Sequence, residues 1–432
     1  MPINRRLFLS SVASAAAGSA ATAAFGKHTD TRENVVAGSD LNVLDKFYIY
    51  TGCNYGNYRG ENPYHFRRGH ESMLTKVSLK NDAVTQSTVA AGSSHYPFVS
   101  PKHDRIVMLD QYGPKCVVLD MDHKEVTAFP APEGYIFSGH GLLLEGTDNL
   151  VIGLYRIGPK TLEDEGMLMV MNLANSTPTI DNKLPSHGLQ PHDMSFMPGK
   201  KLMAVAHAGS TLHHEGKKEF RYTREIVNPG IALLNTSDLS LNKFLRTPEN
   251  AEVTHLAVRD DGKIVCCLNQ KLNTGGLKHR EADLLLADEF KTTDFLLDES
   301  EMRDRGGGVS LSLPALMVDP ETGQSTPFME SIRYQRQGQS VAFNQVTGTT
   351  VVSFLVSSGL LFIGRDGKAE AIPSGSFGIY NVSGLADIPG TPYMAMCGHK
   401  YDMVIVDMRT RSVVHTIRMP MLRATHLVAQ TV

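Results

Sequence analysis

The sequence contains no tryptophan and only five cysteines, and these cysteines show no paired spacing. No CxxC pair and no CxxCH haem-attachment motif occurs, which argues against a thiolate metal site and against covalently bound haem. Adjacent cysteines such as Cys266 and Cys267 do not easily form a normal disulfide. We therefore expect the five cysteines to be small apolar residues buried on strands.

Charge of one sign and long apolar runs are also missing. The formal net charge is -3 over 432 residues, which gives no electrostatic case for nucleic acid or for an anionic membrane as a partner. No stretch after the N-terminus approaches the roughly 18–20 apolar residues that a transmembrane helix needs. GxSxG, HExxH, P-loop and contextual GxGxxG motifs are absent as well. With 41% hydrophobic residues, 38 glycines and 21 prolines, the composition is that of a globular, turn-rich protein.

The N-terminus carries the pattern of an export signal. Residues 4–10 read NRRLFLS and are followed by the weakly apolar stretch SVASAAAGSAATAAFG. Two arginines with Phe and Leu at fixed offsets are typical of the twin-arginine signal, and the ATA at 21–23 fits a cleavage site. We expect a signal peptide at 1–23, a linker at 24–44 and a periplasmic protein that is exported already folded.

One pattern recurs along the rest of the chain. The segments PHDMSFMPGKKLMAVAH (191–207) and THLAVRDDGKIVCCLN (254–269) share a His, alternating residues, a turn with Gly and a short apolar strand. Similar segments begin five further units. The aligned positions are His95, His140, His192, His255, Ser340, Gly384 and His426. The shorter intervals are 42–45 residues, a period typical of propeller blades.

The second half of each unit reads as another hairpin, for example CVVLDMDHKEVTAF and ALMVDPETGQSTPF. Two hairpins per unit without a long helix predict an all-β fold, a seven-bladed β-propeller of four-stranded blades at 45–432. The last unit ends after one strand, THLVAQTV, and 45–53 looks like a second strand. We therefore expect the C-terminal strand to pair with the N-terminal strands and close the ring, which removes open sheet edges.

Four insertions interrupt the repeat, at 54–70, 156–166, 208–228 and 271–308. All fall between the predicted second and third strands of a blade, so antiparallel geometry places them on the face that carries the aligned histidines. The insertion at 271–308, with Gly-rich ends, is expected to act as a lid. This face is the predicted binding face, because loops on a rigid scaffold commonly carry function.

The aligned residues should ring the mouth of the central channel. The candidate ligand-binding residues are His95, His140, His192, His255, Arg336, Ser340 and His426. Two interpretations stay open: each imidazole binds the backbone of a neighbouring blade, or the imidazoles together bind an anion, a metal ion or the edge of a cofactor.

For a metal ion, His140, His192 and His255 are the candidates because they start consecutive blades. Residues across a seven-bladed channel should be too far apart for one ion, so two or three neighbours would have to converge. Strand alternation should point Asp193 away from His192. The ends of the second strands add His207, His399, Asp110, Tyr155 and Asn269 as polar positions.

The stretches SHGLQPHDMSFMPGKKLMAVAHAG, VTHLAVRDDGKIVCCLN, SGHG and QSVAF resemble the signatures of a family of uncharacterised bacterial propeller proteins. That family carries Gly-Pro-His-Glu and Arg-His-Leu-Ala motifs at matching blade starts; here Gln190, Asp193 and Thr254 replace the Gly, the Glu and the Arg. The resemblance covers roughly 45–432. It implies twin-arginine export and a periplasmic role near iron acquisition, because members are often encoded beside imelysin-type iron-uptake proteins.

The functional expectation is therefore a periplasmic propeller that binds a ligand or a protein partner at the channel-mouth face. The partner would be an imelysin-like protein or a small ligand, with a divalent metal ion as the candidate cofactor and a link to iron or metal acquisition. A looser likeness to lactonase-type and amine-dehydrogenase-type propellers keeps a second class open. In that class the protein is a metal-dependent hydrolase or a quinoprotein-like oxidoreductase component.

Overall fold

The computed structural model describes most of the chain after residue 40. The described ranges are 41–54, 72–89, 94–111, 113–157, 165–175, 183–209, 213–215, 219–221, 228–247, 251–272, 309–333, 338–355, 357–398, 400–422 and 424–431. The predicted signal peptide and most of the predicted linker lie outside these ranges and stay predictions.

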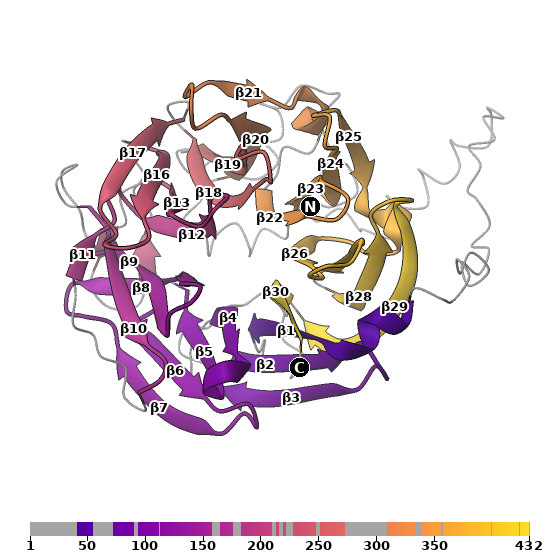
Figure 1. Cartoon of the computed structure of the whole chain (residues 1–432), viewed down its shortest axis with the longest axis horizontal. Coiled ribbons are helices and arrows are strands. Elements are labelled where there is room, and N and C mark those ends of the chain that lie inside the picture. Colours follow the sequence, from indigo (N-terminus) through magenta and orange to yellow (C-terminus); the bar gives the residue numbers. More distant parts are fainter. Residues whose placement is uncertain are drawn as a thin grey trace, which may run out of the picture. The chain divides into compact units, whose positions relative to one another are not determined.

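Seven four-stranded antiparallel sheets are arranged around a central axis (Figure 1), and we number these blades 1 to 7. In that order, the innermost strands are β30 (Ala424–Thr431), β4 (Ser94–Ser100), β8 (Tyr135–Leu143), β12 (Pro191–Phe196), β18 (Glu252–Val258), β22 (Gly338–Asn344) and β26 (Val382–Asp387). The second strands are β1 (Phe47–Asn54), β5 (Arg105–Asp110), β9 (Asn149–Arg156), β13 (Leu202–His207), β19 (Ile264–Leu272), β23 (Thr349–Phe354) and β27 (Tyr393–Gly398).

The outer half of each blade follows the same order. The third strands are β2 (Ser72–Ser78), β6 (Lys115–Leu119), β10 (Met167–Asn172), β16 (Gly230–Asn235), β20 (Val309–Val318), β24 (Gly359–Ile363) and β28 (Lys400–Asp407). The outermost strands are β3 (Val84–Val89), β7 (Glu125–Pro130), β11 (Lys183–Pro185), β17 (Leu241–Arg246), β21 (Ser325–Pro327), β25 (Ala369–Pro373) and β29 (Ser412–Leu422). Short 3₁₀ helices are η2 (Leu41–Lys46), η3 (Pro101–His103), η5 (Met329–Arg333) and η6 (Ser374–Phe377). The prediction of a seven-bladed propeller is confirmed.

The core is divided among the interfaces between blades. The described buried apolar residues form seven clusters, and each cluster joins two neighbouring blades. A sheet with two apolar faces must cover both, and a ring gives every blade a neighbour on each side. The second and third strands together carry most of this burial; all six residues of β23 and all five of β24 are buried, for example. Cys116, Cys266, Cys267 and Cys397 are buried free thiols on such strands, as expected.

The ring is closed by the two ends of the propeller. β1 pairs antiparallel with β30, with Phe47 opposite Thr431 and Thr51 opposite Leu427. β30 also contacts β26 of blade 7 and β4 of blade 2, so the innermost strands form a closed circle. The predicted pairing of the C-terminal strand with the N-terminal strands is confirmed.

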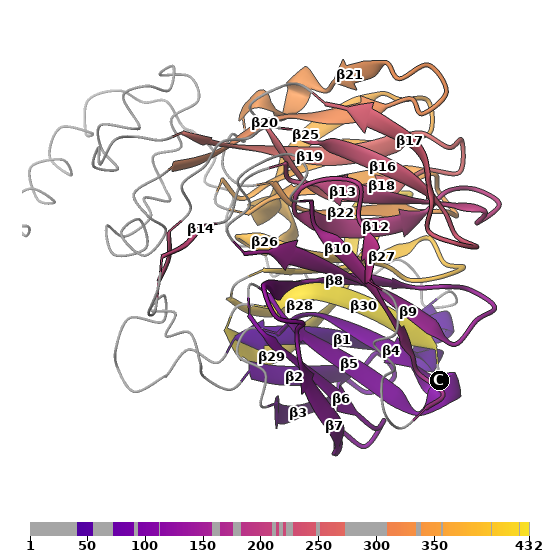
Figure 2. The ribbon, with the colours of Figure 1, turned by 90° about the vertical axis from the view of Figure 1, so that its left-hand side faces the viewer.

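The four predicted insertions fall where they were expected, between second and third strands, since they separate β1 from β2, β9 from β10, β13 from β16 and β19 from β20. The 208–228 insertion contains the hairpin of β14 (His213–Glu215) and β15 (Glu219–Arg221), visible to one side of the blades in Figure 2. The predicted lid at 271–308 lies outside the described residues, except for its first two residues at the end of β19. Within the described part of the chain, no helix combines the length and the apolar character that crossing a membrane requires.

Candidate functional site

Every innermost strand is irregular at the aligned position. In blade 4, Pro191 pairs with His207 and Met194 with Val205, so His192 and Asp193 together face the single residue Ala206. Register shifts occur at the equivalent place in the other six blades. A β-bulge breaks strict alternation and turns a side chain towards a new direction. This repeated bulge turns the aligned residues towards the channel.

Five imidazoles gather as a result. Ring centroids of sequential neighbours are 4.8 Å apart for His95 and His140, 4.5 Å for His140 and His192 and 4.8 Å for His192 and His255. His426 lies 4.4 Å from His95 and 4.7 Å from His255 across the channel. All five residues are at most 4% exposed. We call these five residues the histidine cluster.

Four members meet the geometry of a metal-binding group. One ring nitrogen from each of His95, His140, His192 and His255 lies within 4.8 Å of the other three. The expectation that only two or three neighbours would converge is wrong. Four blades contribute, because the bulges direct the rings inwards and imidazole is long enough to span the narrow channel.

Asp193 is the charged member of the site. Its Oδ1 lies 3.4 Å from Nδ1 of His140 and its Oδ2 lies 3.7 Å from Nδ1 of His255. The carboxylate also accepts hydrogen bonds from the backbone N–H of Met194 at 2.9 Å and of Leu256 at 3.1 Å. Asp193 therefore faces the cluster. The expectation from strand alternation is wrong because Asp193 lies within the bulge, where side chains no longer alternate between the two faces.

Further contacts fix the remaining rings. The hydroxyl of Tyr155 is hydrogen-bonded to Nδ1 of His192, and the two rings are nearly parallel, at 14°. Nε2 of His426 lies 2.9 Å from Nε2 of His95, and the side-chain amide of Gln111 donates to that same atom of His95 at 3.3 Å. By contrast, Nε2 of His140 is buried and has no hydrogen-bond partner among the described residues.

The environment favours neutral imidazoles and an ionised carboxylate. Burial, together with the other histidines, holds the pKa of His95, His192 and His426 well below its ordinary value; burial also lowers the pKa of His255. Burial opposes ionisation of Asp193, but its contacts with His140 and His255 outweigh this and leave its pKa well below the usual range. Neutral imidazole is the form that ligates metal ions.

The other predicted positions have mixed outcomes. Ser340 and Gly384 occupy the aligned places in β22 and β26 and are buried, but neither belongs to the metal-binding group. Arg336 and His399 lie outside the described residues. Tyr155 reaches the site, as described above. Asn269 instead binds the next blade, through two 2.9 Å hydrogen bonds with the backbone of Gly338.

Two residues near the cluster had no signal in the sequence. Gln111, one position past the end of β5, reaches His95. Tyr96 follows His95, and its ring lies 5.9 Å from that of His140 and 6.1 Å from that of His426. Neither residue recurs in the repeat, so alignment of the blades does not single them out. The neighbouring residue Asp110 was predicted, and it accepts a hydrogen bond from the backbone of Lys115.

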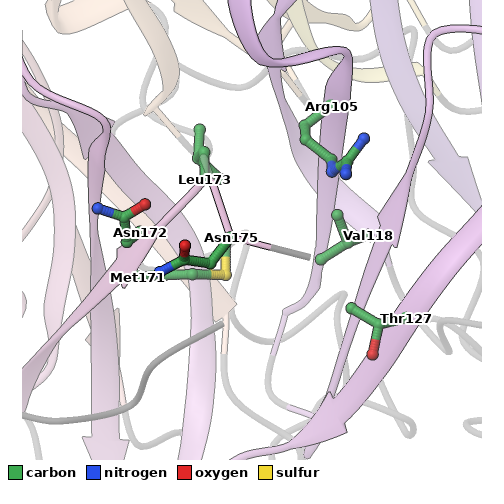
Figure 3. A pocket seen from close by; sticks show the side chains of 7 residues that line it. All are labelled: Arg105, Val118, Thr127, Met171, Asn172, Leu173 and Asn175. Carbon is green, nitrogen blue, oxygen red and sulfur yellow. The ribbon is translucent and has the colours of Figure 1, made fainter. Parts of the chain in front are cut away.

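A separate hollow lies in the outer part of the ring, between blades 2 and 3 (Figure 3). Arg105, Val118 and Thr127 line it from blade 2, and Met171, Asn172 and Leu173 from blade 3. Its lining combines strands β5, β6, β7 and β10 and includes none of the aligned residues. It therefore does not belong to the site at the histidine cluster.

Together, fold and site define the class: a seven-bladed β-propeller whose channel gathers buried imidazoles from five blades. Residues 93–297 match the model of a family described as "Protein of unknown function (DUF1513)". This stretch contains the four histidines of the metal-binding group and Asp193, and it covers just under half of the chain. The expected resemblance to an uncharacterised family is thus supported over that range, whereas twin-arginine export and the link to imelysin stay predictions.

Comparison with solved structures shows how widespread the architecture is, because 1370 chains are similar to this one. One is "Kuenenia stuttgartiensis Hydrazine Synthase", which is 9% identical, with 81% of this chain and 90% of that chain covered and a TM-score of 0.50. At this identity the similarity shows the fold alone. No curated protein matches the sequence.

Proposed function

We propose that this protein binds a divalent transition-metal ion in its channel through His95, His140, His192 and His255. The observation that carries the proposal is the approach of four buried ring nitrogens to within 4.8 Å of one another. Zn²⁺, Cu²⁺, Ni²⁺ and Fe²⁺ all accept imidazole as a ligand. The proposed cofactor is therefore a borderline transition-metal ion rather than Ca²⁺ or Mg²⁺, which prefer oxygen ligands.

The spacing suits an ion after a small contraction. A metal held about 2.0–2.1 Å from four nitrogens keeps them about 3.3–3.4 Å apart in a tetrahedron, and up to about 4.1 Å across a square plane. The most distant pair would have to move closer by about 1 Å, which small side-chain rotations can supply. Nε2 of His140 has no partner among the residues that the structure describes, which gives a reason for the rings to close, because a buried polar atom without a partner costs roughly 1–3 kcal/mol.

The charge of the site also suits a cation. Asp193 contributes one buried negative charge beside imidazoles that are held neutral. A buried carboxylate is costly unless it is paired with a cation or fully hydrogen-bonded. A divalent ion between the rings would offset this charge at a distance set by the histidines.

The cellular setting rests on the sequence alone. The twin-arginine pattern supports export to the periplasm in the folded state, which would allow the ion to be inserted before export. The resemblance to propellers encoded beside imelysin-type proteins supports a role in iron or metal acquisition, with an imelysin-like protein as the candidate partner. The hydrolase and quinoprotein alternatives stay predictions, since no contact of the described residues favours either over binding.

The experiment compares wild-type protein with two triple variants after removal of metal by a chelator. The test variant is His140→Gln/His192→Gln/His255→Gln. The control is His123→Gln/His187→Gln/His415→Gln, which alters three partly exposed histidines outside the cluster. Zn²⁺, Co²⁺ and Cu²⁺ are titrated by calorimetry, elemental analysis gives the stoichiometry, and circular dichroism checks the fold.

We expect one ion per chain in wild type and control, and affinity at least about 100-fold lower in the test variant, since it loses three of four ligands. Wild-type protein that binds none of the three ions would refute the proposal. So would a folded test variant that keeps the wild-type affinity.

A further inference from the structure

Asp193 lies at the junction of three consecutive blades. Its own strand, β12, belongs to blade 4, while His140 comes from blade 3 and His255 from blade 5. One carboxylate thus faces two imidazoles, one with each oxygen, and the centroids of these two rings are 5.1 Å apart.

The backbone holds this carboxylate in a fixed orientation. The N–H of Met194 donates to Oδ1 at 2.9 Å, and the N–H of Leu256 donates to Oδ2 at 3.1 Å. Each oxygen therefore has one backbone donor and one imidazole nitrogen close by. The side chain is only one fifth exposed, so little water competes for its remaining lone pairs.

This arrangement favours one position for the proton of each ring. The two N···O distances are longer than ordinary hydrogen bonds, but an ionised carboxylate can only accept, so it favours the N–H on the ring nitrogen that faces it. For His140 and His255 that nitrogen is Nδ1, at 3.4 Å and 3.7 Å. The lone pair of each neutral ring is then on Nε2, and in His140 this atom is buried and has no hydrogen-bond partner in the described part of the chain.

We propose that Asp193 is the positioning residue of the metal site, which holds His140 and His255 in the tautomer that offers Nε2 to the ion. This inference rests on the proposed function. The carboxylate acts through the two rings and does not touch the ion, because its oxygens are already directed at Nδ1 atoms and backbone donors. Carboxylates behind ligating imidazoles orient the rings and make them stronger bases, and their loss typically costs 10–100-fold in metal affinity.

Tyr155 performs the same task for His192. Its hydroxyl occupies Nδ1 of that ring, which leaves Nε2 for the ion. Tyr155 is nevertheless a neutral partner that can donate or accept, so it does not impose one tautomer as a carboxylate does. Asp193 should therefore matter more than Tyr155 to the binding of metal.

The test uses Asp193→Asn in the full chain, with Asp387→Asn as the matched control. Asp387 is a partly buried carboxyl in blade 7 that contacts Asn344 and none of the cluster histidines. Cu²⁺ affinity is measured by competition with a chelator at pH 8, and electron paramagnetic resonance of the Cu²⁺ complex reports which atoms bind the ion. Thermal unfolding of the metal-free proteins measures any purely structural effect.

We expect Asp193→Asn to bind Cu²⁺ about 10–100-fold more weakly, with altered nitrogen hyperfine couplings but no loss of an oxygen ligand. Asp387→Asn should match wild type in Cu²⁺ affinity and in the electron paramagnetic resonance spectrum. Three results would overturn the inference: wild-type affinity and spectrum in Asp193→Asn, loss of a directly bound oxygen, or a change confined to the unfolding temperature. Absence of Cu²⁺ binding in wild type would instead refute the proposed function itself.

Discussion

His207, the last residue of β13, makes the stability of this protein depend on pH independently of the histidine cluster. The residue is completely buried, and its ring lies 5.8 Å from that of Phe244. Nδ1–H donates to the carbonyl of Val205 at 3.1 Å, while Nε2 is buried without a partner among the described residues. A proton added at Nε2 would place a charge in this buried site, and the hydrogen bonds with the backbone of Ser186 and Val205 offset only part of the cost of desolvation. Burial accordingly lowers the pKa of His207 to about 4.

The sign and size of the effect follow from linkage. The unfolded chain has an ordinary histidine pKa of about 6.5, so between pH 6.5 and 4 the unfolded state binds more protons than the folded state. The free energy of unfolding therefore falls as the pH falls through this window. From these two pKa values His207 alone removes about 2 kcal/mol between pH 8 and pH 5, and about 3 kcal/mol below pH 4.

Urea unfolding at pH 8 and pH 5, with a chelator present, measures this loss in wild type and in His207→Gln. The variant has no group that titrates there, so its loss between the two pH values should be about 2 kcal/mol smaller. Because the cluster histidines are the same in both proteins, their contribution cancels in the comparison. His415→Gln, at a partly exposed site, serves as the control for removing one histidine. Equal losses in wild type and His207→Gln would refute the reasoning.

Two further substitutions test contacts elsewhere in the ring. Burial raises the pKa of Asp387 to about 7. Between about pH 4 and pH 7 the folded state therefore keeps a proton that the unfolded state has lost, and the free energy of unfolding falls as the pH rises through this range. At pH 8, Asp387→Asn should therefore have a free energy of unfolding in urea higher than that of wild type by on the order of 1–2 kcal/mol. A lower free energy of unfolding at that pH would contradict the raised pKa. A Cβ on Gly398 would stand 2.0 Å from the carbonyl oxygen of Tyr380, so Gly398→Ala should cost more than 2 kcal/mol in thermal unfolding. Gly146→Ala, which has open space but a φ of +73°, should cost only about 1 kcal/mol, and equal losses would argue against the clash.

The repeat in the sequence was sufficient to predict the ring, because each blade must bury two apolar faces and reuses the same strand and turn pattern. It also aligned the cluster histidines correctly, since His95 and His426 occupy equivalent places although 331 positions separate them. The direction of Asp193 could not be predicted in this way. Strand alternation assumes regular pairing, and the bulge at residues 192 and 193 has no distinct residue signature.

The distances between side chains inside the channel could not be predicted from the sequence either. Whether His95 can approach His255, three blades away, depends on the width of the closed ring and on how far each bulge turns its side chain. Their centroids are 6.4 Å apart. Gln111 lies in a loop after β5 and owes its position to the fold of that loop, so only the structure brings it to His95.

The same bulges favour one of the two interpretations of the aligned histidines. Blades 6 and 7 form the irregularity with Ser340 and Gly384, so an imidazole is not needed to build an innermost strand or to join it to its neighbours. The rings of His140, His192 and His255 contact Asp193, Tyr155 and one another, whereas an architectural role would direct them to the backbone of the next blade. Keeping several buried imidazoles together costs stability, because the rings lose hydration and their neighbours lower the pKa of His95, His192 and His426 further. A cluster that the fold does not require and that burial disfavours is best explained by a ligand, and neutral imidazoles around one ionised carboxylate fit a metal cation.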